Sequence, residues 1–180
     1  MPRTLKSLKT PLRYPGGKSK AVPKLLQYLP NLFQVKEFRE PFLGGGSVAL
    51  EITKRYPHID VWVNDLYEPL YNFWCELQHN GQELQDALLG IKSIYCNPDA
   101  ARCLFITSKE QINDSDLSNF DRAVAFYIVN KCSFSGLTES SSFSAQASES
   151  NFSTNGIERL TEYSEIIERW KITNLSYESM

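Results

Sequence analysis

The stretch Glu40-Pro41-Phe42-Leu43-Gly44-Gly45-Gly46-Ser47-Val48 determines how the rest of the sequence is interpreted. The spacing Gly-x-Gly-x-x-Ala over 44–49 is typical of turns in which small residues let the backbone approach a ligand and let a helix pack on its strand. Residues 35–40, just before it, have the pattern of a short strand, and 47–56 has the apolar pattern of a helix. The stretch therefore predicts a strand, a glycine turn and a helix in succession.

A second strand and an acidic residue follow this unit. Residues 59–64 are predicted to form the strand, and a right-handed crossover makes it parallel to the first. Asp65 lies at its end, 19 residues after Gly46, where a carboxylate can accept hydrogen bonds from ribose hydroxyls. We therefore expect an α/β fold that opens like a doubly wound nucleotide-binding sheet. A tight glycine turn that binds nothing is the alternative.

An earlier glycine turn, Arg13-Tyr14-Pro15-Gly16-Gly17-Lys18, precedes a predicted helix. It is not a phosphate-binding loop of the Walker type, because that motif requires glycine where this chain has Leu12. Its aromatic ring and lysine could stack on and pair with a ligand that carries a ring and a carboxylate. A turn that only starts a helix is the other interpretation.

The remainder of the chain is mostly helical in pattern. The Ser118-x-x-Asp121 arrangement is typical of a helix start, and it precedes an apolar run that predicts a buried helix. Residues 133–153 contain nine serines and are predicted to form a mobile loop or hairpin instead of a packed element. Helices are expected at 18–29, 68–80, 83–131 (with breaks) and 155–170, and a last strand at 171–176.

Composition and charge limit the classes of function. The formal charge is −2, yet residues 1–24 carry seven basic side chains and no acid, so a polyanion would meet a local basic face. A solvated tail is the alternative. The four cysteines lack metal-site spacing, and we expect buried, reduced thiols and two surface histidines. No apolar run approaches the roughly 20 residues that a bilayer requires, and no signal segment is apparent, which predicts a cytoplasmic protein without a membrane partner.

Four motifs in order resemble the Dam-like family of DNA adenine methyltransferases. They are Leu12 to Lys18, Glu40 to Val48, Asn64-Asp65 with Leu70 and Tyr71 behind it, and Asn130-Lys131-Cys132-Ser133-Phe134-Ser135-Gly136-Leu137. The resemblance covers nearly the whole chain. It implies a Rossmann-like, S-adenosylmethionine-dependent methyltransferase fold with an incomplete sheet and a helical DNA-recognition insertion.

The resemblance also assigns roles to residues. It implies a cofactor-binding part at 1–80, a recognition insertion with a Ser-rich loop at 81–155, and a return to the first part at 156–180. Tyr14 stands where the family commonly has Trp. The residues expected to bind S-adenosylmethionine are Tyr14, Lys18, Glu40, Gly44, Gly46, Ser47 and Asp65. The residues expected near double-stranded DNA are Lys131, Ser133, Ser135 and Gly136.

One motif of the family is missing. These enzymes extrude the adenine and hold its amine with an (Asp/Asn/Ser)-Pro-Pro-(aromatic) loop, but this sequence contains no Pro-Pro pair. We therefore assign no catalytic residue and no metal ligand, and expect the chain alone to be inactive, either as a truncated protein or as one completed by a second chain.

Two other functions compete with this interpretation. An inactive DNA- or cofactor-binding remnant would keep the recognition insertion without catalysis. A nicotinamide-dependent oxidoreductase would use the glycine turn and Asp65 alone. Methylation of cytosine carbon is disfavoured, because it requires a nucleophilic cysteine, usually after proline, and no cysteine here follows one.

Overall fold

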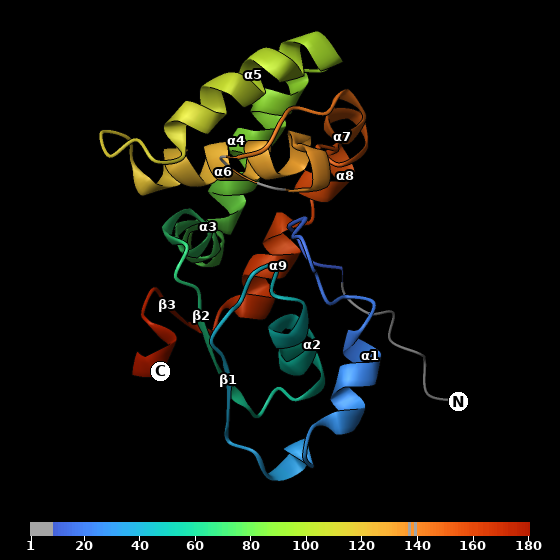
Figure 1. The fold of residues 1–180 in the computed structure, drawn as a ribbon, viewed down its shortest axis with the longest axis vertical. Helices are drawn as coiled ribbons and strands as arrows, with labels where there is room; N and C mark the ends of the chain where they lie inside the picture. The colour runs from blue at the N-terminus through green and yellow to red at the C-terminus, as the bar shows by residue number, and fades with distance from the viewer. Residues whose placement is uncertain (1–8, 137, 139) are drawn as a thin grey trace.

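The computed structural model describes residues 9–136, 138 and 140–180. The first part of the basic segment, with Arg3 and Lys6, and Leu137 of the fourth motif lie outside the described residues. The elements run from an N-terminal turn through a strand–helix–strand unit and a long helical region to a last helix and strand (Figure 1).

The described strands form one parallel sheet in the order β1-β2-β3, which confirms the predicted α/β class. Strand β1 is Glu37–Glu40, β2 is Asp60–Asn64 and β3 is Lys171–Thr173. Two helices, α2 (Ser47–Arg55) and α9 (Leu160–Ile167), lie on the same side of the strands (Figure 1). They cover Val61 and Val63 of β2, which are buried, because alternate residues of a strand face one side.

Strand β3 is shorter than the predicted 171–176. After Thr173 the backbone turns to the side-chain amide of Asn64, whose Oδ1 accepts from the N–H of Leu175 and whose Nδ2 donates to the carbonyl of Leu175. This amide replaces the ladder bonds that a longer strand would make. It draws the end of the chain across the carboxyl end of β2.

Four long helices form the region between β2 and the last helix. Figure 1 shows α4, α5 and α6 at one end of the molecule and the sheet at the other, with α3 between them. Helix α6 has ten consecutive buried residues, 123–132, as expected for a central helix packed on several sides. Ser118 caps it by accepting from the N–H of Asp121, as predicted. The bounds are α3 Glu68–His79, α4 Gly81–Ile94, α5 Pro98–Gln111 and α6 Asn119–Cys132.

The predicted helix at 18–29 is largely wrong. Only α1, Val22–Leu25, is α-helical, and it is followed by the short 3-10 turns η1 (Leu26–Tyr28) and η2 (Leu32–Gln34). Pro23 has no N–H to continue a helix that began at residue 18. Pro30 disfavours helical backbone at the residue before it, and Leu29 is extended. The apolar spacing correctly predicted that Val22 is buried, but it did not indicate how short the helix is.

The serine-rich segment is packed, which corrects the prediction of a mobile loop. It contains η3 (Phe134–Gly136) and α7 (Ala145–Ser150), and is followed by α8 (Thr154–Ile157). Phe152 is fully buried, and the ring of Phe143 lies 5.7 Å from that of Phe105. Ser144 and Ser153 cap the next helices through their side chains. Serine therefore supplies helix caps here and phenylalanine supplies anchors to the core.

The two histidines are exposed, as predicted. The prediction of buried thiols holds only for Cys132, since Cys96 and Cys103 are exposed and Cys75 is half-buried. All four thiols are free. In the part of the chain that the structure describes, no helix is long and apolar enough to cross a bilayer, and no group of three or more His, Cys, Asp or Glu side chains could hold a metal ion.

Candidate functional site

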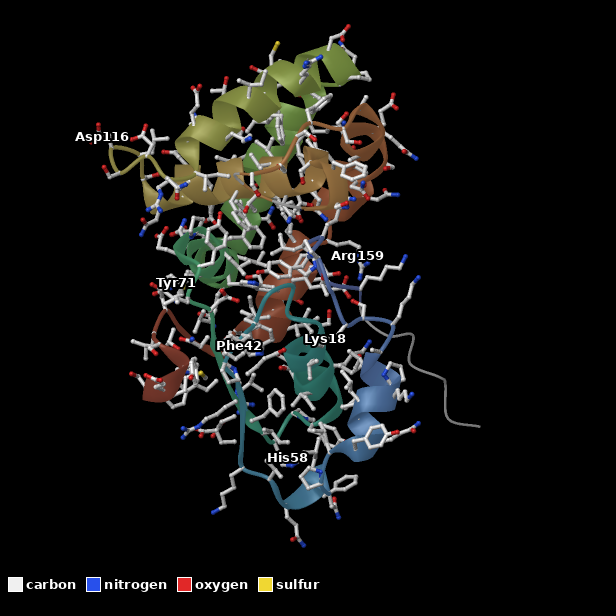
Figure 2. All side chains as sticks on the ribbon, viewed as in Figure 1. Lys18, Phe42, His58, Tyr71, Asp116 and Arg159 are labelled. Atoms are coloured by element: carbon white, nitrogen blue, oxygen red, sulfur yellow. The ribbon has the colours of Figure 1, made fainter. Side chains whose placement is uncertain are left out.

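A cavity of about 240 Å³ opens at the carboxyl ends of β1 and β2. In open parallel sheets this is the end at which ligands bind. Lys18 and Phe42, labelled in Figure 2, both line it. The structure brings six of the seven predicted cofactor-binding residues into this one cavity, and they are Tyr14, Lys18, Glu40, Gly44, Ser47 and Asp65.

Gly46, the seventh predicted residue, lies behind the cavity wall. Its φ is +70°, and a Cβ atom there would lie 2.9 Å from two ring atoms of Trp74. The indole Nε1 of Trp74 donates to the carbonyl of Gly44 at 3.1 Å. Gly46 therefore lets α2 begin against a buried tryptophan, and its contribution to a ligand site is to place the turn.

The first glycine turn is held in a shape that presents Tyr14 to the second. The N–H of Gly17 donates to the carbonyl of Tyr14 at 2.9 Å, and Gly16 has φ +73° after Pro15, which is the pattern of a type II turn. A Cβ atom on Gly44 would lie 3.0 Å from the ring of Tyr14. The ring therefore lies directly on the Gly44 backbone, where a larger side chain would displace it.

Two carboxylates at the strand ends are fixed by backbone donors. Glu40 Oε2 accepts from the N–H of Ala49 at 3.0 Å, within the first turn of α2. Asp65 accepts from the N–H of Gly44 at 2.9 Å and from the N–H of Tyr67 at 3.1 Å. The Asp65 carboxylate therefore shapes the glycine turn directly, a contact that its predicted role did not include.

Burial determines the electrostatics of the cavity. It raises the pKa of Glu40 to about 7, although the Ala49 N–H and the Lys18 ammonium act in the opposite direction. Burial also raises the pKa of Tyr14, with a smaller contribution from the Asp65 charge. A ligand that brings a cation to Glu40 would favour its ionised form. The cavity thus offers one ammonium, two acidic groups and two aromatic rings, a set complementary to an amino acid joined to a nucleoside.

Most of the residues predicted to lie near DNA are inside the protein. Lys131 is buried, with its ammonium 5.1 Å from the ring centre of Tyr127, and burial lowers its pKa to about 8. Ser133 and Gly136 are also buried. Only Ser135 is exposed, in a left-handed conformation with φ 61°. The last turn of the buried helix α6 holds the Lys131 side chain inside the protein, and the place of these four residues near DNA stays a prediction.

Sequence reasoning missed two residues of the site. Phe42 lines the cavity, is 67% exposed and contacts the ring of Tyr177. Its place between a strand end and the glycines was the available signal. Asn130, fully buried, hydrogen-bonds to Arg13 next to the first glycine turn. Its place at the start of the fourth motif, directly after the apolar run 123–129, was the signal for it.

The parallel sheet, the glycine turn at the start of α2 and the acidic residues at two strand ends are those of a Rossmann-like fold. The sequence model of the D12 class N6 adenine-specific DNA methyltransferases matches residues 14–180, and the chain belongs to this family. This confirms the family that the four motifs indicated.

The chain is also similar to individual DNA methyltransferases. The chain is 30% identical over 127 residues to a DNA adenine methylase of Vibrio cholerae, a match that covers 70% of this chain and 42% of that protein. It is 23% identical over 133 residues to the type II methyltransferase M.MjaIII of Methanocaldococcus jannaschii, covering 70% and 46%. A DNA N-6-adenine-methyltransferase of Escherichia phage P1 is 27% identical over 126 residues, covering 70% and 15%. The chain thus spans less than half the length of each.

Proposed function

We propose that the cavity binds S-adenosylmethionine and that the chain serves in methylation of the exocyclic amine of adenine in double-stranded DNA. The observation that carries the proposal is the meeting of Tyr14, Lys18, Glu40 and Asp65, from three distant segments, around one cavity at the strand ends. Membership of the family supports the reaction.

The donor set of the cavity fits the cofactor chemically. The Lys18 ammonium suits the α-carboxylate of its methionine part, and the buried Glu40 carboxylate suits the α-ammonium. Asp65 has acceptor capacity for the ribose hydroxyls beyond its two backbone bonds. Tyr14 and Phe42 supply apolar surface at the rim. When bound, the cofactor supplies an activated methyl group, and the residues of this chain hold and orient it.

We further propose that residues 81–155 form the DNA-recognition part, between cofactor-binding parts at 1–80 and 156–180. Among the four predicted residues, the proposal for direct contact now rests on Ser135, which is exposed beside Phe134. Both border a polar cavity of about 250 Å³ that Arg13 also lines. Hydroxyl and guanidinium groups are typical partners of phosphate and base edges.

The chain by itself is proposed to be inactive. An amine inside a stacked duplex is out of reach, so the base must be extruded and held. The family motif for this, (Asp/Asn/Ser)-Pro-Pro-(aromatic), does not occur in the 180 residues. A further segment, in the same or another polypeptide, would have to supply it.

Titration calorimetry with S-adenosylmethionine, together with methyl transfer to unmethylated DNA by the same preparation, tests the proposal. We expect binding without transfer. Tyr14→Ala and Asp65→Asn should weaken binding at least about tenfold, whereas Tyr28→Ala, on an exposed tyrosine outside the cavity, should not. Absence of cofactor binding would refute the proposed site, and transfer by this chain alone would refute the proposed inactivity.

Two results together would instead indicate an inactive DNA-binding protein. The chain would bind DNA tightly without cofactor, and no methyl transfer would occur when a segment of a relative supplies the missing motif. Binding of a nicotinamide dinucleotide in place of S-adenosylmethionine would indicate an oxidoreductase.

A further inference from the structure

Asn130 joins the helical region to the segment that carries Tyr14 and Lys18. It lies in the last turn of α6 and is fully buried. Its Oδ1 accepts from the N–H of Arg13 at 2.9 Å, and its Nδ2 donates to the carbonyl of Arg13 at 2.6 Å. One amide side chain therefore satisfies both backbone groups of a residue 117 positions away.

Residues after Asn130 also contact Arg13 and fix its position. Asn130 Nδ2 also donates to the carbonyl of Gly136 at 3.2 Å. Gly136 has φ +74°, and a Cβ atom there would lie 2.6 Å from Cβ of Arg13 and 2.7 Å from its carbonyl oxygen. The guanidinium of Arg13 donates to the carbonyl of Ser133 at 2.7 Å. Backbone and side chain of Arg13 are thus both held by the end of α6 and by η3.

The turn beyond Arg13 makes few hydrogen bonds to the rest of the described chain, although the ring of Tyr14 lies on the Gly44 backbone. Among the described residues, 9–21 form no helix or strand, and the bond from Gly17 to Tyr14 is internal to the turn. The hydroxyl of Ser19 bonds that of Ser47 at 3.0 Å, and the hydroxyl of Tyr163 bonds the carbonyl of Lys9. The Asn130 bonds lie between these two attachments, immediately before Tyr14.

We propose that Asn130 is a positioning residue that places Tyr14 and Lys18 at the cofactor cavity by holding the peptide groups of Arg13. This inference rests on the proposed function for its effect on cofactor affinity. It assigns to the Asn130–Gly136 stretch a role in the cofactor site, in addition to its proposed place near DNA. Without the Asn130 amide, the N–H and carbonyl of Arg13 would lose their hydrogen-bond partners, which costs free energy unless they reach water. We therefore expect the turn to move away from α6 when the amide is removed.

Asn130→Ala is the direct test, and Asn72→Ala is its matched control. Asn72 is also buried in a helix and donates to a backbone carbonyl at 2.8 Å, but that carbonyl belongs to Asn119 at the start of α6 and not to Arg13. Hydrogen exchange, followed by mass spectrometry without ligand, should show faster exchange of the peptide covering residues 12–22 in Asn130→Ala and not in Asn72→Ala. This readout does not depend on the cofactor, so it tests the inference even if the proposed function fails.

Cofactor affinity provides the second readout. Calorimetry should give a dissociation constant for S-adenosylmethionine about tenfold higher in Asn130→Ala and unchanged in Asn72→Ala. In a Tyr14→Ala, Lys18→Ala background, the added Asn130→Ala change should have little further effect, because the groups that it positions are gone.

Unchanged exchange of residues 12–22 in Asn130→Ala would overturn the inference, as would an affinity loss that adds fully in the double background. If Asn130→Ala does not fold, Asn130→Asp is used, since it keeps the acceptor for the Arg13 N–H and loses both donated bonds. The same local increase in exchange is then expected, and its absence is equally decisive.

Discussion

Replacement of Glu40 by Gln should stabilise the protein while weakening its proposed ligand binding. Glu40 lies at the carboxyl end of β1, where burial raises its pKa from 4.5 to about 7. Because Glu40 is harder to ionise in the folded protein than in the unfolded chain, its ionisation lowers the free energy of unfolding. Gln keeps an oxygen that can accept from the Ala49 N–H at 3.0 Å and removes that cost.

The magnitude follows from the shift. Between pH 4.5 and 7 the unfolded chain has released the Glu40 proton and the folded chain retains it, so the free energy of unfolding falls as the pH rises through this window. Each pKa unit corresponds to about 1.4 kcal/mol. Glu40→Gln should therefore raise the free energy of unfolding by about 3 kcal/mol at pH 8 and by about 1 kcal/mol at pH 5.5.

Urea unfolding at the two pH values measures the effect. Glu37→Gln is the matched control, because Glu37 is an exposed residue of the same strand whose ion pair with Arg39 lies at the surface. It should change stability by less than about 1 kcal/mol at either pH. Equal effects of Glu40→Gln at both pH values, or destabilisation at pH 8, would refute the reasoning. Calorimetry should show weaker binding of S-adenosylmethionine by the same variant.

Three further predictions test how the protein is packed. Gly46→Ala should destabilise the protein by about 2 kcal/mol or more in urea unfolding, because Gly46 has a positive φ and an added Cβ atom would lie 2.9 Å from the Trp74 ring. The control is Gly90→Ala in α4, where an added Cβ atom meets open space. It should stabilise the protein by up to about 1 kcal/mol. Burial lowers the pKa of Lys131 to about 8, so Lys131→Met should raise the free energy of unfolding by about 3 kcal/mol at pH 7. This gain should disappear as the pH rises from 8 to 10.5. The DNA affinity of the variant, measured by fluorescence anisotropy at several salt concentrations, should not change. Cys96 and Cys103 should react rapidly with an aromatic disulfide reagent, whereas Cys132, buried and with its pKa raised to about 12, should react only after unfolding; rapid reaction of Cys132 in the native protein would contradict its burial.

Local patterns predicted the elements that carry the cavity at the strand ends. The strand at 35–40, the helix at 47–56 and the strand at 59–64 correspond to β1, α2 and β2 within a few residues. Their parallel pairing is also confirmed. Turn chemistry and apolar spacing act within a few residues of each other, so the sequence displays them directly. The cofactor role of the residues in the cavity stays a prediction.

The features that the sequence did not reveal share a physical cause. The family resemblance implied that Lys131 lies near DNA, and this stays a prediction, but the sequence did not show that its side chain is buried, because the faces that α6 buries are determined by the helices around it. The serine-rich segment was expected to be mobile, but Phe143 and Phe152 anchor it to helices that composition does not reveal. Burial depends on neighbours distant in sequence, and local composition is a poor guide to it.

The sequence by itself determined the class of fold, the family and six of the residues that meet at the cavity. Glycines, prolines and strand-end carboxylates are required at particular backbone positions, and those requirements leave short, ordered motifs. Only the tertiary structure decided that Asp65 shapes the glycine turn and that Asn130 holds Arg13 across 117 residues. A hydrogen bond between two distant residues imposes no periodicity on the chain between them, so it becomes visible only when the helical region packs against the sheet domain.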